Sequence, residues 1–159
     1  MTDHRDEASR GDFALAELAP VGHAIFRVAR LHKTLAGRLL RELGLYPGQE
    51  LVMMRLWTEG PQRQVDLVRM LESEAPTVTR TIGRLEKAGL VFTTRSPTDR
   101  RSVVVTATEA SLALRERVEQ AWAMLEARTV GTWDERRRQD VLDALHALEA
   151  NLAEGPDEG

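Results

Sequence analysis

Four polar side chains in the middle of the chain share hydrogen-bonding chemistry. They are Thr77, Thr79, Arg80 and Arg84. A short hydroxyl approaches phosphates and base edges closely, and a guanidinium grips guanine O6 and N7 with two hydrogen bonds, worth roughly 1–3 kcal/mol of discrimination. Short hydroxyls and an arginine near the start of a helix are what a reader of the DNA major groove needs. An ordinary solvated helix face is the alternative interpretation.

Two polar residues in this region, Arg84 and Gln64, have roles that the sequence leaves open. Arg84 lies one turn further from the helix start than Arg80. A phosphate contact or a pair with a neighbour such as Glu86 explains Arg84 as well as a base contact does. Gln64 either caps an earlier helix or touches a phosphate.

The tip of a predicted hairpin carries a second polar group, Thr98-Asp99-Arg100-Arg101. Asp99 precedes Arg101 by two positions, close enough for its carboxylate to orient a guanidinium aimed into a narrow minor groove. Arg100 or Arg101 is then the inserted side chain. Asp99 itself positions and does not touch DNA, because phosphates repel a bare carboxylate. In the alternative interpretation, these charged residues only solvate the tip of the hairpin and do not contact DNA.

Apolar periodicity defines the helix that presents the first group. Over residues 77–88 the buried stripe consists of Val78, Ile82 and Leu85. Pro76 fits the first position of this helix, where its missing N–H costs nothing. Gly89 ends the helix as a left-handed cap.

The surrounding segments complete a recognisable order of elements. A helix over residues 64–71 comes first and is separated from the next by a polar turn at 72–75. Two runs rich in β-branched residues, 90–94 and 102–106, then predict a β-hairpin with a loop longer than a tight turn. Helix, turn, helix and basic hairpin are the order of a winged helix, a device that reads DNA.

These residues resemble the MarR family of transcriptional regulators. The resemblance rests on four segments in order: Pro76-Thr77-Val78-Thr79-Arg80, Leu85-Glu86-Lys87-Ala88-Gly89-Leu90-Val91, Asp99-Arg100-Arg101 and Val105-Thr106-Ala107-Thr108-Glu109. It implies a mainly α fold with a small β-wing, in which a winged helix-turn-helix lobe joins N- and C-terminal dimerisation helices. The family usually carries Leu-Thr-Glu-x-Gly after the second wing strand. This chain departs from that pattern, but Thr108 still supplies a helix cap.

The flanking helices carry apolar stripes that one winged lobe is too small to cover. The first helix is expected over 13–43 with Gly44 as its stop, the second begins at Pro47, and a later one spans about 109–130. Thr132 followed by Glu135 predicts a capping box for the last. The stripes of the first and the last two helices consist of Val21, Ile25, Val28, Leu35, Leu39, Leu114, Val118, Trp122, Leu125, Val141, Leu145, Leu148 and Leu152. We therefore expect a homodimer, which the resemblance also implies.

The dimer's two-fold symmetry sets the expected target and the expected organisation. Two recognition helices entering successive major grooves need half-sites roughly 10 bp apart, hence a palindromic operator of double-stranded DNA. A chain of 159 residues holds one core. We expect a single domain at 13–153, between a disordered segment at 1–12 and a disordered tail at 154–159. Within this domain, the dimerisation helices are expected at 13–46 and 109–153 and the DNA-binding lobe at 47–108.

Charge and composition fit this assignment. Residues 62–108 hold eight basic and five acidic side chains, a surplus of three positive charges, although the whole chain carries −3. Positive charge therefore collects on the expected DNA lobe.

The absence of cysteine excludes disulfides, thiolate zinc sites and cysteine-based peroxide sensing. Without a signal peptide or an apolar run of membrane length, the protein is expected to be cytoplasmic.

The resemblance also implies a small aromatic or phenolic effector, bound in a cleft between the DNA lobe and the dimer helices. The candidate lining residues are His23, Arg27, Arg30, His32 and Trp57. Surface roles for the histidines and core or interface roles for the tryptophans are the alternatives.

No cofactor, metal or enzymatic activity is expected, because no phosphate loop, nucleophile elbow or metal motif is present. The alternative function is a protein-interaction winged helix whose basic face binds an acidic partner.

Overall fold

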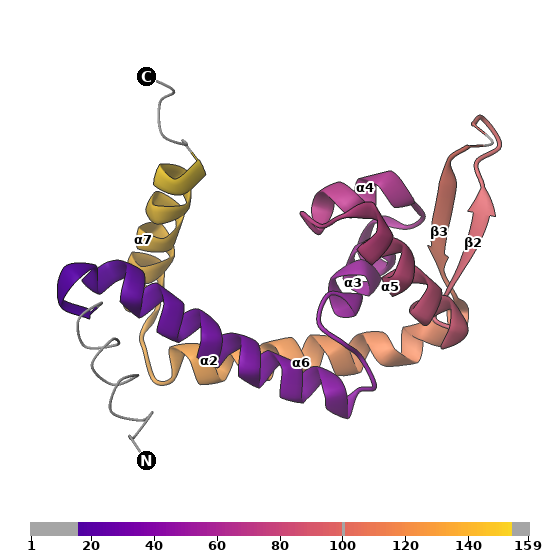
Figure 1. Cartoon of the computed structure of the whole chain (residues 1–159). Helices are drawn as coiled ribbons and strands as arrows, with labels where there is room; N and C mark the ends of the chain where they lie inside the picture. The colour runs from indigo at the N-terminus through magenta and orange to yellow at the C-terminus, as the bar shows by residue number, and fades with distance from the viewer. Residues whose placement is uncertain (1–15, 100, 154–159) are drawn as a thin grey trace, which may run out of the picture. The chain divides into compact units, whose positions relative to one another are not determined.

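The computed structural model describes residues 16–99 and 101–153. Its elements follow in the order α2 (Pro20–Glu42), α3 (Gln49–Glu59), β1 (Gln62–Arg63), α4 (Gln64–Met70), α5 (Ala75–Lys87), β2 (Val91–Arg95), β3 (Val103–Ala107), the 3-10 turn η1 (Glu109–Ser111), α6 (Leu112–Val130) and α7 (Glu135–Ala153) (Figure 1). The predicted mainly α fold with a small β-wing is confirmed. The chain divides into two compact units, one up to Leu125 and one from Glu126 onward. Within the described residues, no helix has the length and apolar character needed to cross a membrane.

The strands form one antiparallel sheet in which β3 lies between β1 and β2. β2 and β3 pair along their whole lengths, so the predicted hairpin is confirmed, with each strand one residue later than expected. β1 adds a third strand that the sequence pattern does not predict. It pairs Gln62 with Val105, and two polar residues are too few to show the alternation of a strand.

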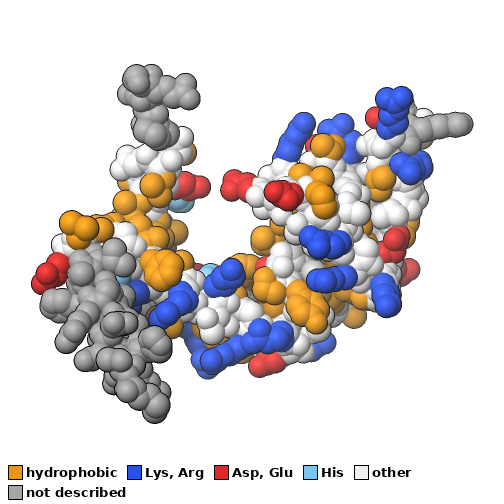
Figure 2. All heavy atoms as spheres, in the orientation of Figure 1, with side chains coloured by type: hydrophobic (Ala, Val, Ile, Leu, Met, Phe, Trp, Pro, Cys, Tyr) orange, Lys and Arg blue, Asp and Glu red, His pale blue; other side chains and the backbone are white. Residues whose placement is uncertain are grey.

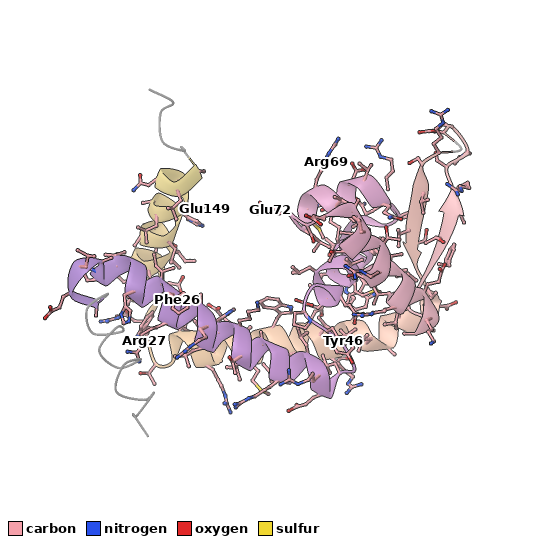
Figure 3. The ribbon with its side chains drawn as sticks, viewed as in Figure 1. Phe26, Arg27, Tyr46, Arg69, Glu72 and Glu149 are labelled. Carbon is pink, nitrogen blue, oxygen red and sulfur yellow. The ribbon has the colours of Figure 1, made fainter. Side chains whose placement is uncertain are left out.

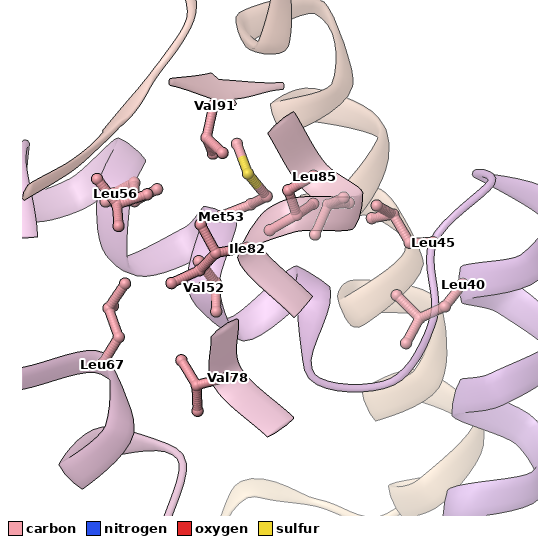
Figure 4. Close-up of a cluster of buried hydrophobic side chains, with 12 residues drawn as sticks. Leu40, Leu45, Val52, Met53, Leu56, Leu67, Val78, Ile82, Leu85 and Val91 are labelled. Atoms are coloured by element: carbon pink, nitrogen blue, oxygen red, sulfur yellow. The ribbon is translucent and has the colours of Figure 1, made fainter. Parts of the chain in front are cut away.

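The core of the first unit brings α3, α5 and the sheet together (Figure 4). Its buried side chains include Met53 from α3, Leu85 from α5 and Val105 from β3, none of them more than 1% exposed. Leu40 from α2 and Val118 from α6 belong to the same cluster. The two long helices are therefore tied to the winged lobe, defined as α3 to β3, by shared apolar packing.

The ends of α5 follow its sequence closely. The helix begins at Ala75, so Pro76 occupies its second position and not its first. An N–H at either position has no partner inside a helix, and proline is tolerated at both. Gly89 adopts the left-handed conformation with φ of +74°. Its N–H donates to the Glu86 carbonyl over 2.9 Å, and the Leu90 N–H donates to the Leu85 carbonyl over 3.0 Å, which is the Schellman arrangement.

Other helix starts also differ from the predictions. α2 begins at Pro20 and α6 at Leu112, whereas starts at 13 and about 109 were expected. α3 begins at Gln49 and not at Pro47, because Gly48 is left-handed with φ of +95°. The predicted capping box at Thr132 is wrong. α7 begins at Glu135, and the Asp134 carboxylate accepts the Arg137 N–H over 2.8 Å, so Asp134 caps the helix. The predicted cap at Thr108 is confirmed, since its hydroxyl accepts the Ser111 N–H at the start of η1.

One apolar stripe on α2 is covered in its later part and bare in its earlier part. Leu39 and Leu40 line a small cavity with Trp122 and Leu125 of α6. Further toward the N-terminus, apolar side chains that are 40–66% exposed are Val21, Ile25, Phe26, Val28 and Leu31. In the second unit, α7 buries no residue, although it carries leucines at helical spacing. Among the described residues, each unit thus presents an apolar helical surface that remains exposed.

A buried carboxylate lies in the first turn of α3. Glu50 is 5% exposed, and its Oε2 atom has no hydrogen-bond partner. Burial raises the pKa of Glu50, while hydrogen bonds from the backbone of Glu50 and Gly48 partly oppose that shift. A pKa raised by folding means that the protonated form fits the folded state better. Ionisation of Glu50 therefore opposes folding increasingly as the pH rises through its folded-state pKa.

We expect Glu50→Gln to stabilise the protein at pH 8 by about 1 kcal/mol, because the amide occupies the same place without the charge whose burial is costly. The gain should shrink as the pH falls toward about 4.5, where glutamate is protonated in the unfolded chain as well. Urea denaturation at pH 5 and pH 8 measures both differences. The exposed Glu126→Gln is the control, and an equal effect of Glu50→Gln at both pH values would contradict the prediction.

Candidate nucleic-acid interface

The predicted DNA-contacting residues of α5 lie on its exposed side. Thr77, Thr79, Arg80 and Arg84 are all exposed, whereas the apolar stripe of the same helix is buried. The helix therefore packs one face on the core and presents hydroxyls and guanidinium groups on the other. Figure 2 shows Lys and Arg side chains over the winged lobe, including the end of the hairpin.

Gln64 connects the two helices of the helix-turn-helix. Its Nε2 donates to the Thr79 hydroxyl over 2.7 Å, and that hydroxyl donates to the Ala75 carbonyl over 2.9 Å. The amide side chain therefore does not cap α4, whose N-cap residue is Arg63 without a side-chain bond. Of the two roles predicted for Gln64, capping is wrong and the phosphate contact stays a prediction. Residues 15 positions apart in sequence meet here, which no local pattern signals.

Arg80 stays beside the first turn of α5. Its Nη2 donates to the Thr77 hydroxyl over 3.5 Å, a distance at which a hydrogen bond is weak. The Thr77 carbonyl accepts the Thr81 hydroxyl over 3.0 Å. Arg80 is exposed and loosely held, so exchanging this bond for one to a base edge costs little.

Arg84 has a partner that none of its three predicted roles includes. Its guanidinium carbon lies 6.0 Å from the centre of the Tyr46 ring, over the ring face. Tyr46 comes from the connection between α2 and α3 and is 60% exposed (Figure 3). At this distance a cation–π contact is weak to moderate. The described partner of Arg84 is therefore a tyrosine from outside the recognition helix.

A further basic group at the start of α4 escapes the sequence analysis. The Arg63 guanidinium forms two hydrogen bonds to the Asp66 carboxylate, of 2.7 and 3.0 Å, and Arg69 lies 3.8 Å from the same carboxylate (Figure 3). The bond to Asp66 raises the pKa of Arg63, with a smaller contribution from Asp99 of the wing loop. It also lowers the pKa of Asp66. The i, i+3 spacing of Arg63 and Asp66 is the signal that could have found this pair.

The wing loop is organised by Asp99, although differently from the prediction. Its Oδ1 atom accepts the backbone N–H of Arg101 over 3.0 Å, and its carbonyl accepts the Ser102 N–H over 2.9 Å. The carboxylate therefore positions Arg101 through its backbone, whereas a bond to the guanidinium was expected. Arg101 is exposed. Arg100, the other predicted wing residue, lies outside the described residues.

The recognition helix and the wing are joined directly. Glu86 of α5 accepts two hydrogen bonds of 3.0 Å from Thr93 of β2, one from its N–H and one from its hydroxyl. The two bonds tie α5 to β2 and restrain the separation between helix and wing. The sequence offers no signal for this link, since Glu86 alone looks like an ordinary solvated residue.

The predicted effector residues do not gather in one cavity of the winged lobe. Trp57 lines an open groove of about 230 Å³ together with Pro61, Thr108 and Leu112, and its indole N–H donates to Ser111 over 2.9 Å. The other four candidates, His23, Arg27, Arg30 and His32, belong to α2 and line none of that groove. Arg27, labelled in Figure 3, is exposed. The five-residue effector site stays a prediction.

The chain is similar to known transcriptional regulators in both sequence and fold. The model of the MarR family matches residues 45–103. The uncharacterized HTH-type transcriptional regulator YwoH of Bacillus subtilis is 40% identical over 94 residues, which cover 59% of this chain and 69% of YwoH. Two solved structures share the fold. A mutant MarR of E. coli complexed with operator DNA has a TM-score of 0.75 at 22% identity, covering 84% of this chain and 96% of that chain. Bordetella bronchiseptica BpsR, whose DNA binding is regulated by 6-hydroxynicotinic acid, has a TM-score of 0.72 at 26% identity, with coverage of 81% and 92%.

Proposed function

The chain belongs to the MarR family of DNA-binding transcriptional regulators, and from this premise we propose that it is a homodimeric repressor of a palindromic operator. In this proposal α5 reads base edges in the major groove and Arg101 reaches the neighbouring minor groove or its phosphates. A small aromatic or phenolic effector releases the protein from DNA.

The observation that carries the proposal is the exposed polar face of α5 on a rigid support. Thr77, Thr79 and Arg80 lie at the start of the helix, where a recognition helix contacts bases. Gln64 ties this helix to α4, and Glu86 ties it to the wing. A helix held on both sides presents its donors at fixed positions, which sequence-specific reading requires. The E. coli MarR complexed with operator DNA has the same fold.

The apolar surfaces of the two units support the homodimer. Val21, Ile25 and Val28 form one exposed stripe on α2, and α7 has no buried residue. A second copy of the chain covers both in this proposal, and a two-fold axis then relates two α5 helices. Such a pair fits two half-sites roughly 10 bp apart. Repression follows if the operator overlaps a promoter.

Release by an effector requires that the ligand prefer one arrangement of the dimer. A ligand shifts only an equilibrium between states that it binds unequally. In this proposal it favours a dimer whose α5 helices have the wrong separation for the operator. The regulation of BpsR by 6-hydroxynicotinic acid supports the chemical class, a small aromatic acid. Titrating such compounds against the DNA complex tests this part, and unchanged DNA affinity would count against it.

Two arginine variants separate the proposed roles of helix and wing. We expect Arg80→Ala to relax preference at one base pair of each half-site, by the roughly 1–3 kcal/mol that a bidentate contact supplies. Arg101→Ala should weaken binding to all sequences and reduce the slope of log affinity against log salt by about 1 per half-site. Competition binding at several salt concentrations measures both, with Arg117→Ala on α6 as the charge-matched control. Equal, sequence-blind losses from both variants would show that α5 is not the reading helix.

A further inference from the structure

We propose that Thr79 recognises a thymine through its methyl group, with Gln64 as the positioning residue that holds its hydroxyl away from the bases. This inference rests on the proposed function, operator recognition by α5, and assigns the base class at one position of the operator.

The hydroxyl of Thr79 is already engaged in the free protein. A threonine hydroxyl has one proton to donate and two lone pairs to accept with. The proton goes to the Ala75 carbonyl over 2.9 Å, and one lone pair accepts the Gln64 amide over 2.7 Å. The hydroxyl therefore has no proton left for guanine N7, guanine O6 or thymine O4, unless it gives up a bond inside its own helix.

These two bonds also fix where the methyl group lies. Threonine in a helix divides between two χ1 rotamers, because its hydroxyl can bond the carbonyl one turn back. The Ala75 bond is of this kind, and the Gln64 bond adds a second constraint from another helix. Thr79 therefore keeps one rotamer, and its methyl group keeps one position on the exposed side of α5.

The position of Thr79 suits an apolar contact in the major groove. It is the fifth residue of a helix that begins at Ala75, it is exposed, and it directly precedes Arg80. Of the four bases, only thymine presents a methyl group in the major groove, and threonine methyls contact it. The thymine is expected beside the base pair that Arg80 reads.

Replacing thymine by deoxyuracil tests the contact, because it removes the methyl group and leaves every hydrogen-bonding atom in place. An operator is first selected from random DNA with the full-length wild type. Each thymine is then replaced in turn, symmetrically in both half-sites, and the dissociation constant is measured. One replacement should weaken wild-type binding by about fourfold per half-site, the equivalent of one buried methyl group.

Three variants show which part of the Thr79 side chain causes the deoxyuracil penalty. Thr79→Val keeps the methyl group without the hydroxyl and should retain the deoxyuracil penalty. Thr79→Ser keeps the hydroxyl without the methyl group and should abolish it. Gln64→Ala should reduce the penalty while leaving the urea unfolding midpoint close to that of the wild type, because it frees the Thr79 rotamer and removes no core contact.

The opposite pattern would overturn the inference. If Thr79→Ser keeps the penalty, a side chain other than Thr79 contacts the thymine methyl group. If Thr79→Val loses the penalty while Thr79→Ser keeps it, the hydroxyl and not the methyl group of Thr79 is the required part. If no thymine of the operator responds to deoxyuracil, the methyl contact is absent, although operator binding itself stands. If the wild type enriches no sequence from random DNA, the proposed function and this inference fail together.

Discussion

Replacing Leu85 by alanine is expected to lower the free energy of unfolding by about 2–5 kcal/mol, the range for a buried leucine whose site cannot collapse. Leu85 is 1% exposed and belongs to the cluster that includes Met53 of α3 and Val91 of β2 (Figure 4). A domain of this size is stable by only about 5–15 kcal/mol in total. The loss therefore removes a large share of the stability of the recognition helix and its support.

Urea denaturation followed by circular dichroism measures this loss, at one fixed protein concentration because the proposed dimerisation would contribute to the apparent stability. Lys87→Ala, two residues further along α5 and exposed, is the control and should change stability by no more than about 0.5 kcal/mol. A loss from Leu85→Ala below 1 kcal/mol would mean that α5 does not pack on α3 and the sheet as described.

The second large effect is expected at the apolar stripe of α2. Ile25→Asp combined with Val28→Asp places two carboxylates on the surface that we assign to the dimer interface. Burying unpaired charge is costly, so the variant should be monomeric at micromolar concentration. A monomer holds one half-site only, and losing the second lowers operator affinity by a factor of about 10²–10⁴.

Sedimentation and operator binding measured on the same preparations test this prediction. Thr34→Asp adds a carboxylate to the opposite side of α2, since each residue advances a helix by about 100°, and Thr34 is exposed. This control should stay dimeric and bind DNA with unchanged affinity. A double variant that remains dimeric would place the interface elsewhere.

Local patterns were sufficient to predict the elements of the winged lobe. The spacing of Val78, Ile82 and Leu85 gives α5, and Gly89 gives its end, because helical periodicity and a left-handed cap are each properties of adjacent residues. The hairpin follows from two β-branched runs. The predicted helix starts were less accurate. Pro47 and Thr132 are residue types that favour a helix start, but Gly48 precedes the first residue of α3 and Asp134 caps α7.

The links between elements could not be predicted. Gln64 bonds to Thr79 and Glu86 to Thr93 across turns, and Arg84 contacts a tyrosine 38 positions earlier. Each link depends on the packing of whole helices, which one sequence does not reveal. The same reason hides Glu50, because an acidic residue in the first turn of a helix is normally solvated. The sequence thus identified which polar residues belong to the candidate interface, whereas their hydrogen-bond and ring-contact partners became known only from the structure.

The central claim is that this protein binds one DNA sequence in preference to others. A mobility-shift titration of the purified protein with the DNA upstream of its own gene, at a stated salt concentration and with excess nonspecific competitor, tests it most directly. We expect a saturable complex that survives the competitor. A complex lost to any competitor, together with no enrichment of bound fragments from the whole genome, would contradict the claim and favour a winged helix that binds an acidic protein partner.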